Sequence, residues 1–504
     1  MRIRIEGWIR NNTGVMYFLL FFILISFSKI IFLTNYHYST DSIFINYNGF
    51  ASLLSIIIDS NGRLIFWLFT KITYLSGLNV GDATQLSLVL AIVAAAFTST
   101  IIIRKINHIT GGKENNTLLF LLVSLVFTSP LILELFYFYE SFVMQLSIMF
   151  SVLAANIIAS EYRTRPTRIL IAATLLVMTL LSYQTSFVVF VVYVTVLLAL
   201  NARFNIKNMF YGTNIKRIID SIFALVIGFS FVAVLFKLVM NVSRANQLDI
   251  SQLFSLANYS ALLGIFKMIY SSSSSLYIGA YLILFFSIIA IMMAKKQYFE
   301  LLNCIIIQAI MVLETLVLSI LPIAMSKGQI IEPRMMAGAV FCISLVPIIF
   351  IGAKQKVLKF VFVLPIPLII LLIINVLISL RWQRASIDNG KIDAEWSDSV
   401  SSIIKSNPNI KKAIRFQDAR IEEYSNRPVS YPAGVTSVNM RASMTEWSTI
   451  ESLYLYSGLR LSKFEATKGY KYFEYQSYCS SNDWDNFNPD QVKFAEDAVI
   501  ICVY

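Results

Sequence analysis

Residues 36–63 read YHYSTDSIFINYNGFASLLSIIIDSNGR and follow the first long apolar run of the chain. They contain two acids, Asp41 and Asp59, and one base, Arg63, in a region that otherwise has little charge. An acid just beyond a membrane helix lies at the boundary between water and lipid, where it stays ionised and can still reach a lipid-borne substrate. The alternative is structural, because Thr40-Asp41-Ser42 is also favourable chemistry for capping a short interfacial helix.

The composition around this stretch is that of a polytopic membrane protein. The 504 residues are 57% hydrophobic and 14% charged, with a mean hydropathy of +0.69, whereas soluble domains have about 45–50% apolar and about 25% charged residues. Residues 381–504 hold fifteen Lys/Arg and sixteen Asp/Glu, a net charge of −1. The whole chain has a net charge of +12, so residues 1–380 have a net charge of +13. Basic loops on one side of a membrane explain this charge, so no nucleic-acid partner is expected.

Eleven apolar stretches are long enough to cross a bilayer. The first, Val15–Leu33, is followed by no small-residue cleavage site, so we do not expect a cleavable signal peptide. Two shorter pieces, Ile43–Ile58 and Leu64–Leu75, are predicted to be helices that lie along the membrane surface. The other ten predicted spans are 83–103, 117–133, 142–159, 168–183, 186–200, 218–240, 276–294, 300–325, 335–353 and 357–380.

The distribution of basic residues sets the orientation. With a cytoplasmic N-terminus, eighteen Lys/Arg lie in cytoplasmic loops and six in the opposite loops, as the positive-inside rule requires. If Leu64–Leu75 crossed the membrane, this bias would invert. An odd number of spans places residues 381–504 outside, where helical patterns and apolar strand patterns indicate a small α/β domain. The helices are expected at Ser397–Ile404 and Thr445–Tyr456, and the strands at Ala413–Phe416 and Ala498–Tyr504.

The outward-facing segments carry the other candidate residues. Glu140 follows the aromatic run Phe136–Tyr139, which would alternatively be an ordinary interfacial belt of aromatic residues. Tyr183 and Gln184 form a tight turn between two spans and would alternatively only satisfy backbone groups there.

A second acid and base stand beside a rigid turn in Glu332-Pro333-Arg334. Because arginine pairs bidentately with phosphate, Arg334 is a candidate for binding a lipid phosphate; otherwise it would extend to the headgroups as an anchor. Within the spans, Glu314 is the most central charge, and Lys29 is expected to reach the membrane surface.

Several familiar site chemistries are missing from the sequence. It contains no P-loop, GxGxxG, CxxC or HExxH motif, and its two histidines argue against a histidine-based metal site or catalytic triad.

In their order along the chain, Asp41, Gly62-Arg63, Tyr183-Gln184 and an outside C-terminal domain resemble the Gtr-type O-antigen glucosyltransferases. These are bacterial, serotype-converting membrane enzymes of the GT-C class. The resemblance implies a GT-C-like catalytic domain over residues 1–380, with a first periplasmic loop at 34–82, and a periplasmic domain over 381–504. It places the chain in the bacterial inner membrane, with the N-terminus cytoplasmic and the C-terminus periplasmic.

The resemblance also implies the reaction and its partners. Glucose would move from undecaprenyl-phosphate-glucose to lipid-linked O-antigen, and a donor-synthesising enzyme and a flippase would supply the donor. The family's first-loop acid matches Asp41 as the base. Relatives often have two adjacent acids there, and Ser42 at the second position favours a metal-free mechanism without a cofactor. The family also implicates basic residues of the C-terminal domain, for which the local candidates are Lys463, Lys468 and Lys471.

The resulting hypothesis is an inverting hexosyltransferase in which Asp41 is the general base and Arg334, with Arg63, holds the donor phosphate. The remaining substrate contacts are assigned to Asp59, Glu140, Tyr183, Gln184, Glu332 and the three lysines. An O-antigen polymerase or ligase, or a non-enzymatic flippase for lipid-linked sugars, is the alternative.

The four cysteines fall into two pairs. Cys304 and Cys342 lie in apolar spans and are expected to be packing residues. Cys479 and Cys502 lie in the tail, which the predicted topology places in the oxidising periplasm, so a disulfide between them is expected.

Overall fold

The structure is a computed structural model that describes most of the membrane-embedded chain and the larger part of the C-terminal region. The described ranges are 13–57, 62–111, 116–161, 164–203, 205–237, 274–294, 298–324, 337–352, 365–417, 441, 443, 448–463, 477–479, 487–495 and 498–503.

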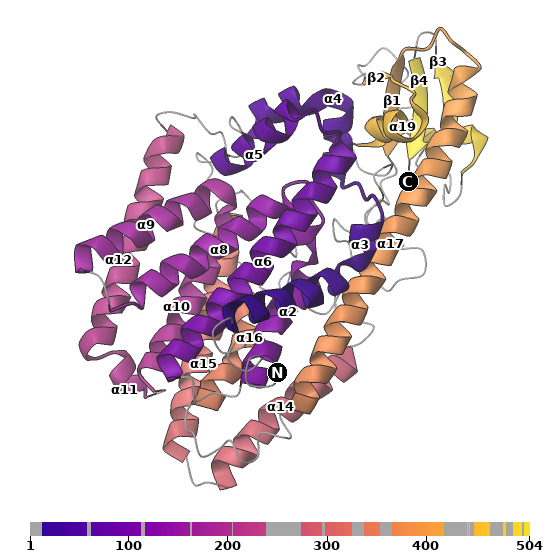
Figure 1. Ribbon diagram of the computed structural model, residues 1–504. Coiled ribbons are helices and arrows are strands. Elements are labelled where there is room, and N and C mark those ends of the chain that lie inside the picture. Colours follow the sequence, from indigo (N-terminus) through magenta and orange to yellow (C-terminus); the bar gives the residue numbers. More distant parts are fainter. Residues whose placement is uncertain are drawn as a thin grey trace, which may run out of the picture.

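The described part is a bundle of helices with a small sheet at one end (Figure 1). The α-helices are α2 (Thr13–Ser28), α3 (Ile30–Thr34), α4 (Thr40–Ile56), α5 (Leu64–Leu75), α6 (Val80–Thr110), α7 (Asn116–Thr128), α8 (Ser141–Ile158), α9 (Arg165–Ser182), α10 (Phe187–Asn201), α11 (Ile206–Met209), α12 (Gly212–Leu235), α14 (Ser274–Ala294), α15 (Tyr298–Ala324), α16 (Ala337–Gly352), α17 (Pro365–Lys405) and α19 (Thr449–Ser457). Three short 3₁₀ helices are η2 (Pro130–Phe136), η3 (Gln184–Ser186) and η10 (Pro489–Gln491).

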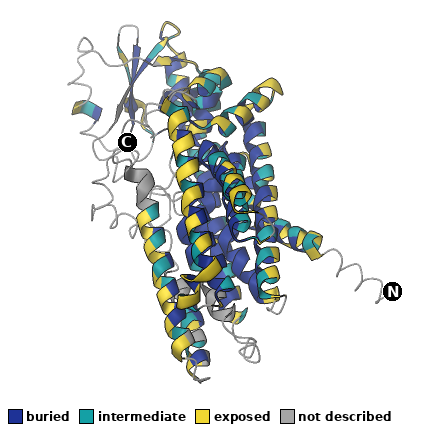
Figure 2. Cartoon of the chain, turned by 90° about the vertical axis from the view of Figure 1, so that its left-hand side faces the viewer, coloured by how far each residue is buried: buried dark blue, intermediate teal, exposed yellow. Residues whose placement is uncertain are grey.

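Every one of the eleven predicted spans contains a helix, yet the count of eleven is not confirmed. By length and composition, seven helices of the described chain are able to cross a membrane, or eight if α7 and η2, which meet at a bend of 62°, form one span. The outer helices expose large apolar side chains, for example Phe223, Val226 and Phe231 of α12, while buried residues gather inside the bundle (Figure 2). An apolar exterior of this kind suits a lipid environment.

The first predicted span is broken at Lys29, between α2 and α3. Gln383 of α17 fills the break, because its Nε2 donates to the Ser28 carbonyl at 2.7 Å and its Oε1 accepts from the Phe32 N–H at 3.2 Å. Backbone groups freed inside a membrane need such partners. The expectation that Lys29 reaches the membrane surface is wrong: its side chain is completely buried, with Nζ 5.0 Å from the ring centroid of Phe136.

Helices α4 and α5, predicted to lie along the membrane surface, cross the end of the bundle that also carries the sheet (Figure 1). The 12 residues of α5 are too few for a span. Helix α4 is bent at Gly49, which has a non-helical backbone with φ 80° and ψ 162°.

One helix joins the bundle to the sheet. The 41 residues of α17 run without interruption from the membrane region into the C-terminal region (Figure 1). The predicted domain boundary at 380/381 therefore falls inside a helix, and the division into two domains stays a prediction.

The sheet consists of β1 (Lys412–Gln417), β2 (Ser462–Lys463), β3 (Val492–Ala495) and β4 (Ala498–Val503), in the order β2-β1-β4-β3. Strand β1 pairs in parallel with β2 and β4, and β3 pairs antiparallel to β4. All six residues of β4 are buried. Trp396 and Val400 of α17 and Leu453 of α19 pack in the same apolar cluster as the strands. The two strands predicted from the sequence are thus β1 and β4, and the two predicted helices are the end of α17 and α19.

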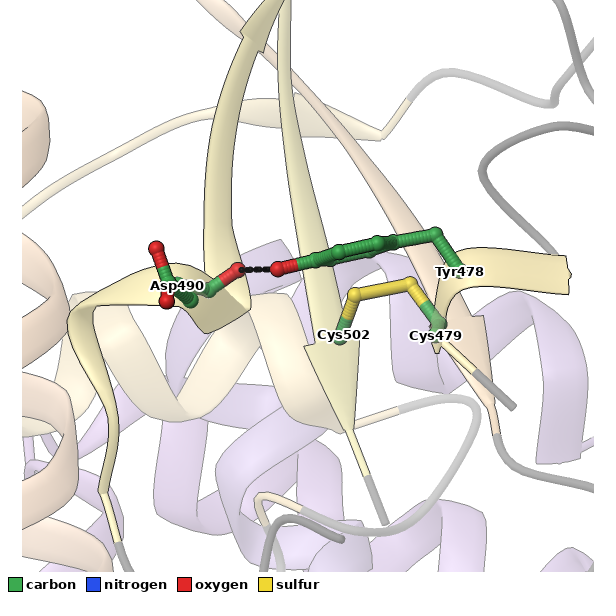
Figure 3. Close-up of a disulfide and its surroundings, with 4 residues drawn as sticks. All are labelled: Tyr478, Cys479, Asp490 and Cys502. Atoms are coloured by element: carbon green, nitrogen blue, oxygen red, sulfur yellow. Dashed lines mark hydrogen bonds between the residues drawn. A yellow bond between two sulfur atoms is a disulfide. The ribbon is translucent and has the colours of Figure 1, made fainter. Parts of the chain in front are cut away.

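Cys479 and Cys502, the pair singled out from the sequence, are joined in a disulfide across 23 residues of sequence, with their Cα atoms 5.2 Å apart (Figure 3). The neighbouring Tyr478 hydroxyl donates to the Asp490 carbonyl at 3.2 Å. The disulfide therefore ties residues 477–479 to the buried strand β4. Cys304 and Cys342 are buried and lie outside the disulfide, as expected for packing residues.

Candidate functional site

The turn between η2 and α8, residues 137–140, lies at the centre of the candidate site. Its aromatic side chains are 1–3% exposed, so the alternative of an interfacial aromatic belt is wrong. Tyr139 is surrounded by Phe50, Phe66 and Phe69, with ring centroids 5.6–5.9 Å away, and its hydroxyl hydrogen bonds with Thr73. The turn is thus buried in protein and held by α4 and α5 rather than by lipid.

Arg63, Glu140 and Tyr183, three residues singled out separately in the sequence, meet beside this turn. Nη1 of Arg63 donates to both carboxylate oxygens of Glu140, at 2.8 and 2.9 Å. The guanidinium carbon lies 4.9 Å from the ring centroid of Tyr183. Side-chain exposure is 15% for Arg63 and 11% for Glu140, so the pair is partly desolvated and stronger than a surface pair.

Three chain segments build this cluster. Arg63 is the N-cap of α5, Glu140 is the N-cap of α8, and Tyr183 is the extended residue that ends α9. Buried Nε of Arg63 has no hydrogen-bond partner within the described ranges. Burying an N–H donor without a partner is costly, so a ligand oxygen that reached this atom would remove that cost.

Asp41 lies in the first turn of α4 and is exposed. The cap of this helix is Ser39, whose Oγ accepts from the Ser42 N–H at 3.1 Å. The alternative in which Asp41 only caps the helix is therefore wrong. A carboxylate in the first turn is still stabilised by the positive end of the helix dipole.

The segment that leads into Asp41 is fastened to the central turn. Tyr137 donates its hydroxyl to the Tyr38 carbonyl at 3.0 Å, and His37 Nε2 donates to the Tyr137 carbonyl at 3.2 Å. The imidazole stacks on Phe32, with ring centroids 4.3 Å apart. Burial lowers the pKa of His37 to about 4, so the ring is neutral at pH 7.

Three carboxylates act electrostatically on Tyr137. Burial raises the pKa of its hydroxyl, and the negative charges of Asp393, Asp41 and Glu134 raise it further. Asp41 is therefore within electrostatic range of the Tyr137 hydroxyl, at the start of the turn that ends at Glu140. Sequence analysis missed this role of Tyr137, for which the only signal was the aromatic run itself.

Two further anchors were also missed. Tyr36 donates to Asp82 Oδ1 at 2.7 Å and so attaches the same segment to the start of α6. Asp393 of α17 is buried and accepts from Arg441 Nε at 2.8 Å and from Ser443 Oγ at 2.5 Å. Both acids lie in patterns that give no distinct sequence signal.

The other predicted residues are less informative. Gln184 opens η3 and is half-buried, and Lys463 ends β2, where it pairs with Ala413. Glu314 accepts from Thr195 Oγ1 at 2.9 and 3.2 Å in the interior of the bundle. Asp59, Glu332, Arg334, Lys468 and Lys471 lie outside the described residues.

No group of three or more His, Cys, Asp or Glu side chains that could hold a metal ion occurs in the part of the chain that the structure describes. Ser42, where relatives often have a second acid, hydrogen bonds through its hydroxyl to Ser39 Oγ at 3.0 Å. The metal-free mechanism stays a prediction.

Comparison with known proteins gives one match. The family model described as "Glucosyl transferase GtrII" matches residues 30–345, more than half of the chain. Asp41, Arg63, Glu140 and Tyr183 lie within the matched range, and the C-terminal lysines lie beyond it. No curated protein and no solved structure matches the chain.

Proposed function

Because the chain belongs to the glucosyl transferase GtrII family, we propose that it is an inverting hexosyltransferase that uses a polyprenyl-phosphate donor. The hexose is glucose, the donor is undecaprenyl-phosphate-glucose or a similar lipid, and the acceptor is lipid-linked O-antigen or a related surface glycan. The reaction takes place at the periplasmic face of the inner membrane.

The observation that carries this proposal is the meeting of Arg63, Glu140 and Tyr183 beside the turn that begins at Tyr137, whose hydroxyl lies within electrostatic range of Asp41. Asp41 takes the proton from an acceptor hydroxyl while that oxygen attacks the anomeric carbon. The bond between this carbon and the phosphate oxygen breaks on the opposite face, which inverts the configuration. The polyprenyl phosphate leaves with the bonding electrons, and Asp41 keeps the proton.

Arg63 binds the leaving phosphate in this proposal. Glu140 holds Nη1 and Tyr183 stacks against the guanidinium plane, so Nε is fixed in direction before a ligand arrives. Donors fixed in advance in a site of low polarity stabilise developing charge more than mobile donors do. Arg334 is the second proposed phosphate ligand. Asp59, Gln184, Glu332 and the lysines Lys463, Lys468 and Lys471 are proposed substrate contacts.

The charge distribution supports the orientation. Arg165 and Arg168 at the start of α9 pair with Asp220 near the start of α12, so both of these helix ends lie together. Lys105 near the end of α6 lies within electrostatic range of Arg217 in the same region. A basic end of this kind faces the cytoplasm, and the Asp41 end then faces the periplasm.

The test is structural analysis of surface polysaccharide from cells with and without the gene, together with transfer by the purified protein in liposomes. We expect one added glucose per acceptor unit, and transfer when donor and acceptor lie on the same face of the membrane. An unchanged polysaccharide in cells whose membranes contain the protein would overturn the proposal. Movement of the donor across the liposome membrane without transfer would instead indicate a flippase.

A further inference from the structure

The bend in α4 separates the part of the helix that carries Asp41 from the rest. Gly49 has φ 80° and ψ 162°, a backbone region that is essentially restricted to glycine. A Cβ atom at this position would meet no other atom within 4 Å, so the backbone angle alone requires glycine here. Residues 40–48, the leading half of α4, are therefore placed by their own contacts and not by the continuation of the helix.

The C-terminal region supplies a set of these contacts. The Tyr47 hydroxyl donates to the Leu461 carbonyl at 2.5 Å. The guanidinium of Arg460 lies 5.3 Å from the ring centroid of Tyr47 and 5.6 Å from that of Tyr454. The two rings are 5.7 Å apart and meet edge to face at 86°.

The arrangement joins elements that are more than 400 residues apart in sequence. Tyr47 is in the leading half of α4, Tyr454 is in α19, and Arg460 lies in the short connection between α19 and β2. Figure 1 shows α4 beside α19 at the end of the bundle. Arginine binds well between aromatic faces because its planar cation is weakly hydrated. The Tyr47–Leu461 hydrogen bond fixes the direction of the contact as well as its distance.

Two attachments, one just before the leading half of α4 and one within it, involve different parts of the chain. Residues 36–39 are held by Tyr137 of the bundle, whereas Tyr47 is held by the C-terminal region. Asp41 lies between them, so its carboxylate position depends on both.

We propose that Tyr47, Tyr454 and Arg460 form a clamp through which the C-terminal region positions Asp41 against the acceptor hydroxyl. The three are positioning residues, because they act through the leading half of α4. The inference rests on the proposed function of Asp41 and assigns the C-terminal region a role in the reaction that differs from covering the site.

The test compares Arg460→Ala and Tyr47→Phe with Lys493→Ala. Lys493 of β3 makes a comparable cation–π contact, 5.0 Å from the ring centroid of Tyr478, and is therefore the matched control in the same region. Tyr47→Phe keeps the ring and removes only the hydrogen bond to Leu461. Arg460→Lys keeps the charge without the planar group and is expected to restore part of the activity.

The position of α4 is measured directly with spin labels on Asn46→Cys and Asp398→Cys. The native cysteines are buried or in the disulfide, so the labels attach at the introduced positions. In Arg460→Ala we expect a broader distance distribution and about a fivefold lower kcat, the upper end of what the loss of an exposed cation–π contact costs. The KM for the donor should stay within about twofold, because the phosphate site lies on Arg63. Lys493→Ala should match the wild type in all three quantities.

An unchanged distance distribution in Arg460→Ala, or a broadened one with a wild-type kcat, would overturn the clamp. Asp41→Asn is assayed in parallel so that the two proposals fail separately. If Asp41→Asn keeps full transfer, the base assignment fails. The distance distribution then still supports the clamp if it is broadened and overturns it if it is not.

Discussion

The two ends of the helical bundle each contain a buried ion pair, and the two pairs are built differently. At one end, Arg63 binds a single carboxylate, Glu140, and stacks on Tyr183. At the other end, the completely buried Asp220 accepts from Arg165 Nε at 2.6 Å and from Arg168 Nη2 at 2.5 Å.

The difference lies in what surrounds the carboxylate and its arginines. Both carboxylate oxygens of Asp220 accept hydrogen bonds. Two arginines share this one acid, so the group has a net positive charge, as expected on the basic side of a membrane protein. At the opposite end one arginine pairs with one carboxylate, and its guanidinium also contacts the ring of Tyr183. In both groups an arginine, Arg63 or Arg168, keeps a buried Nε–H without a partner among the described residues. The Asp220 group therefore has the composition of a structural staple, and the Arg63 group that of a ligand site. An ion pair alone does not identify function; the two groups differ in the number of arginines for each carboxylate and in the aromatic ring against Arg63.

The largest effect is expected for Asp41→Asn. The amide keeps the size of the side chain but cannot accept the proton, so transfer should fall by at least about 100-fold, within the range for general-base catalysis. Initial rates of purified protein in liposomes measure this. Asp82→Asn is the control, since Asp82 at the same end is engaged by Tyr36 and Asn79, and its activity should change less than threefold. Retention of more than about a tenth of the activity by Asp41→Asn would remove Asp41 as the base.

The second prediction tests the staple. Asp220→Asn leaves Arg165 and Arg168 without a charged partner, and breaking a buried pair costs about 3 kcal/mol of unfolding free energy. Transfer per folded molecule should not change. Glu161→Gln is the matched variant: Glu161 pairs with Arg217 at 3.1 Å, but its side chain is 81% exposed, so its loss should cost less than about 1 kcal/mol. Denaturation in detergent measures both. A loss of transfer that exceeds the loss of folded protein would give Asp220 a role in the reaction.

The third prediction tests which end faces outward. The disulfide between Cys479 and Cys502 closes a loop of 23 residues and in the chain-entropy model stabilises the fold by about 3 kcal/mol. Cys479→Ser should lower the unfolding free energy by about this amount. In protein taken directly from membranes and denatured without reduction, neither Cys479 nor Cys502 should react with a thiol reagent. Reaction of both would contradict an oxidising compartment for the sheet, and with it the assignment of the Arg63 end to the periplasm.

The fourth prediction compares the two ends by the same substitution. Arg63→Lys keeps the charge but loses the planar group, its stacking on Tyr183 and the Nε donor, so transfer should fall about tenfold with a higher KM for the donor. Arg165→Lys at the opposite end should stay within about twofold of the wild type, because Arg165 is half-exposed and shares Asp220 with Arg168. Equal effects of the two substitutions would show that the Arg63 pair is structural too.

Much of the arrangement could be predicted because it depends on composition and order. The lengths of the apolar stretches predict where the helices run. The positions of the basic loops predict which helix ends lie on the same side of the membrane. The sequence also picked out Arg63, Glu140 and Tyr183 one by one. It could not show that they touch, since the contact depends on how α5, α8 and α9 pack. The continuous α17 was missed because residues 381–396 are polar, and polarity at a membrane surface resembles a domain boundary. Arg460 was missed because one arginine beside a turn has no pattern until α4 is placed against it.

The smallest expected effect concerns His37, at the Asp41 end. Burial lowers the pKa of His37 to about 4, against about 6.5 in an unfolded chain. The folded protein therefore binds fewer protons than the unfolded chain between these values, and the stability that neutral His37 contributes is full above pH 6.5 and is lost as the pH falls toward 4. At pH 5.5 the loss should be about 1 kcal/mol. His37→Gln keeps a donor for the Tyr137 carbonyl and cannot titrate. Unfolding free energies at pH 7.5 and pH 5.5 should therefore differ by about 1 kcal/mol less in the variant than in the wild type. An identical pH dependence in the two proteins would mean that His37 is more accessible to protons than its stacking on Phe32 indicates, and the fastening of Asp41 to the central turn would then be looser than the structure describes.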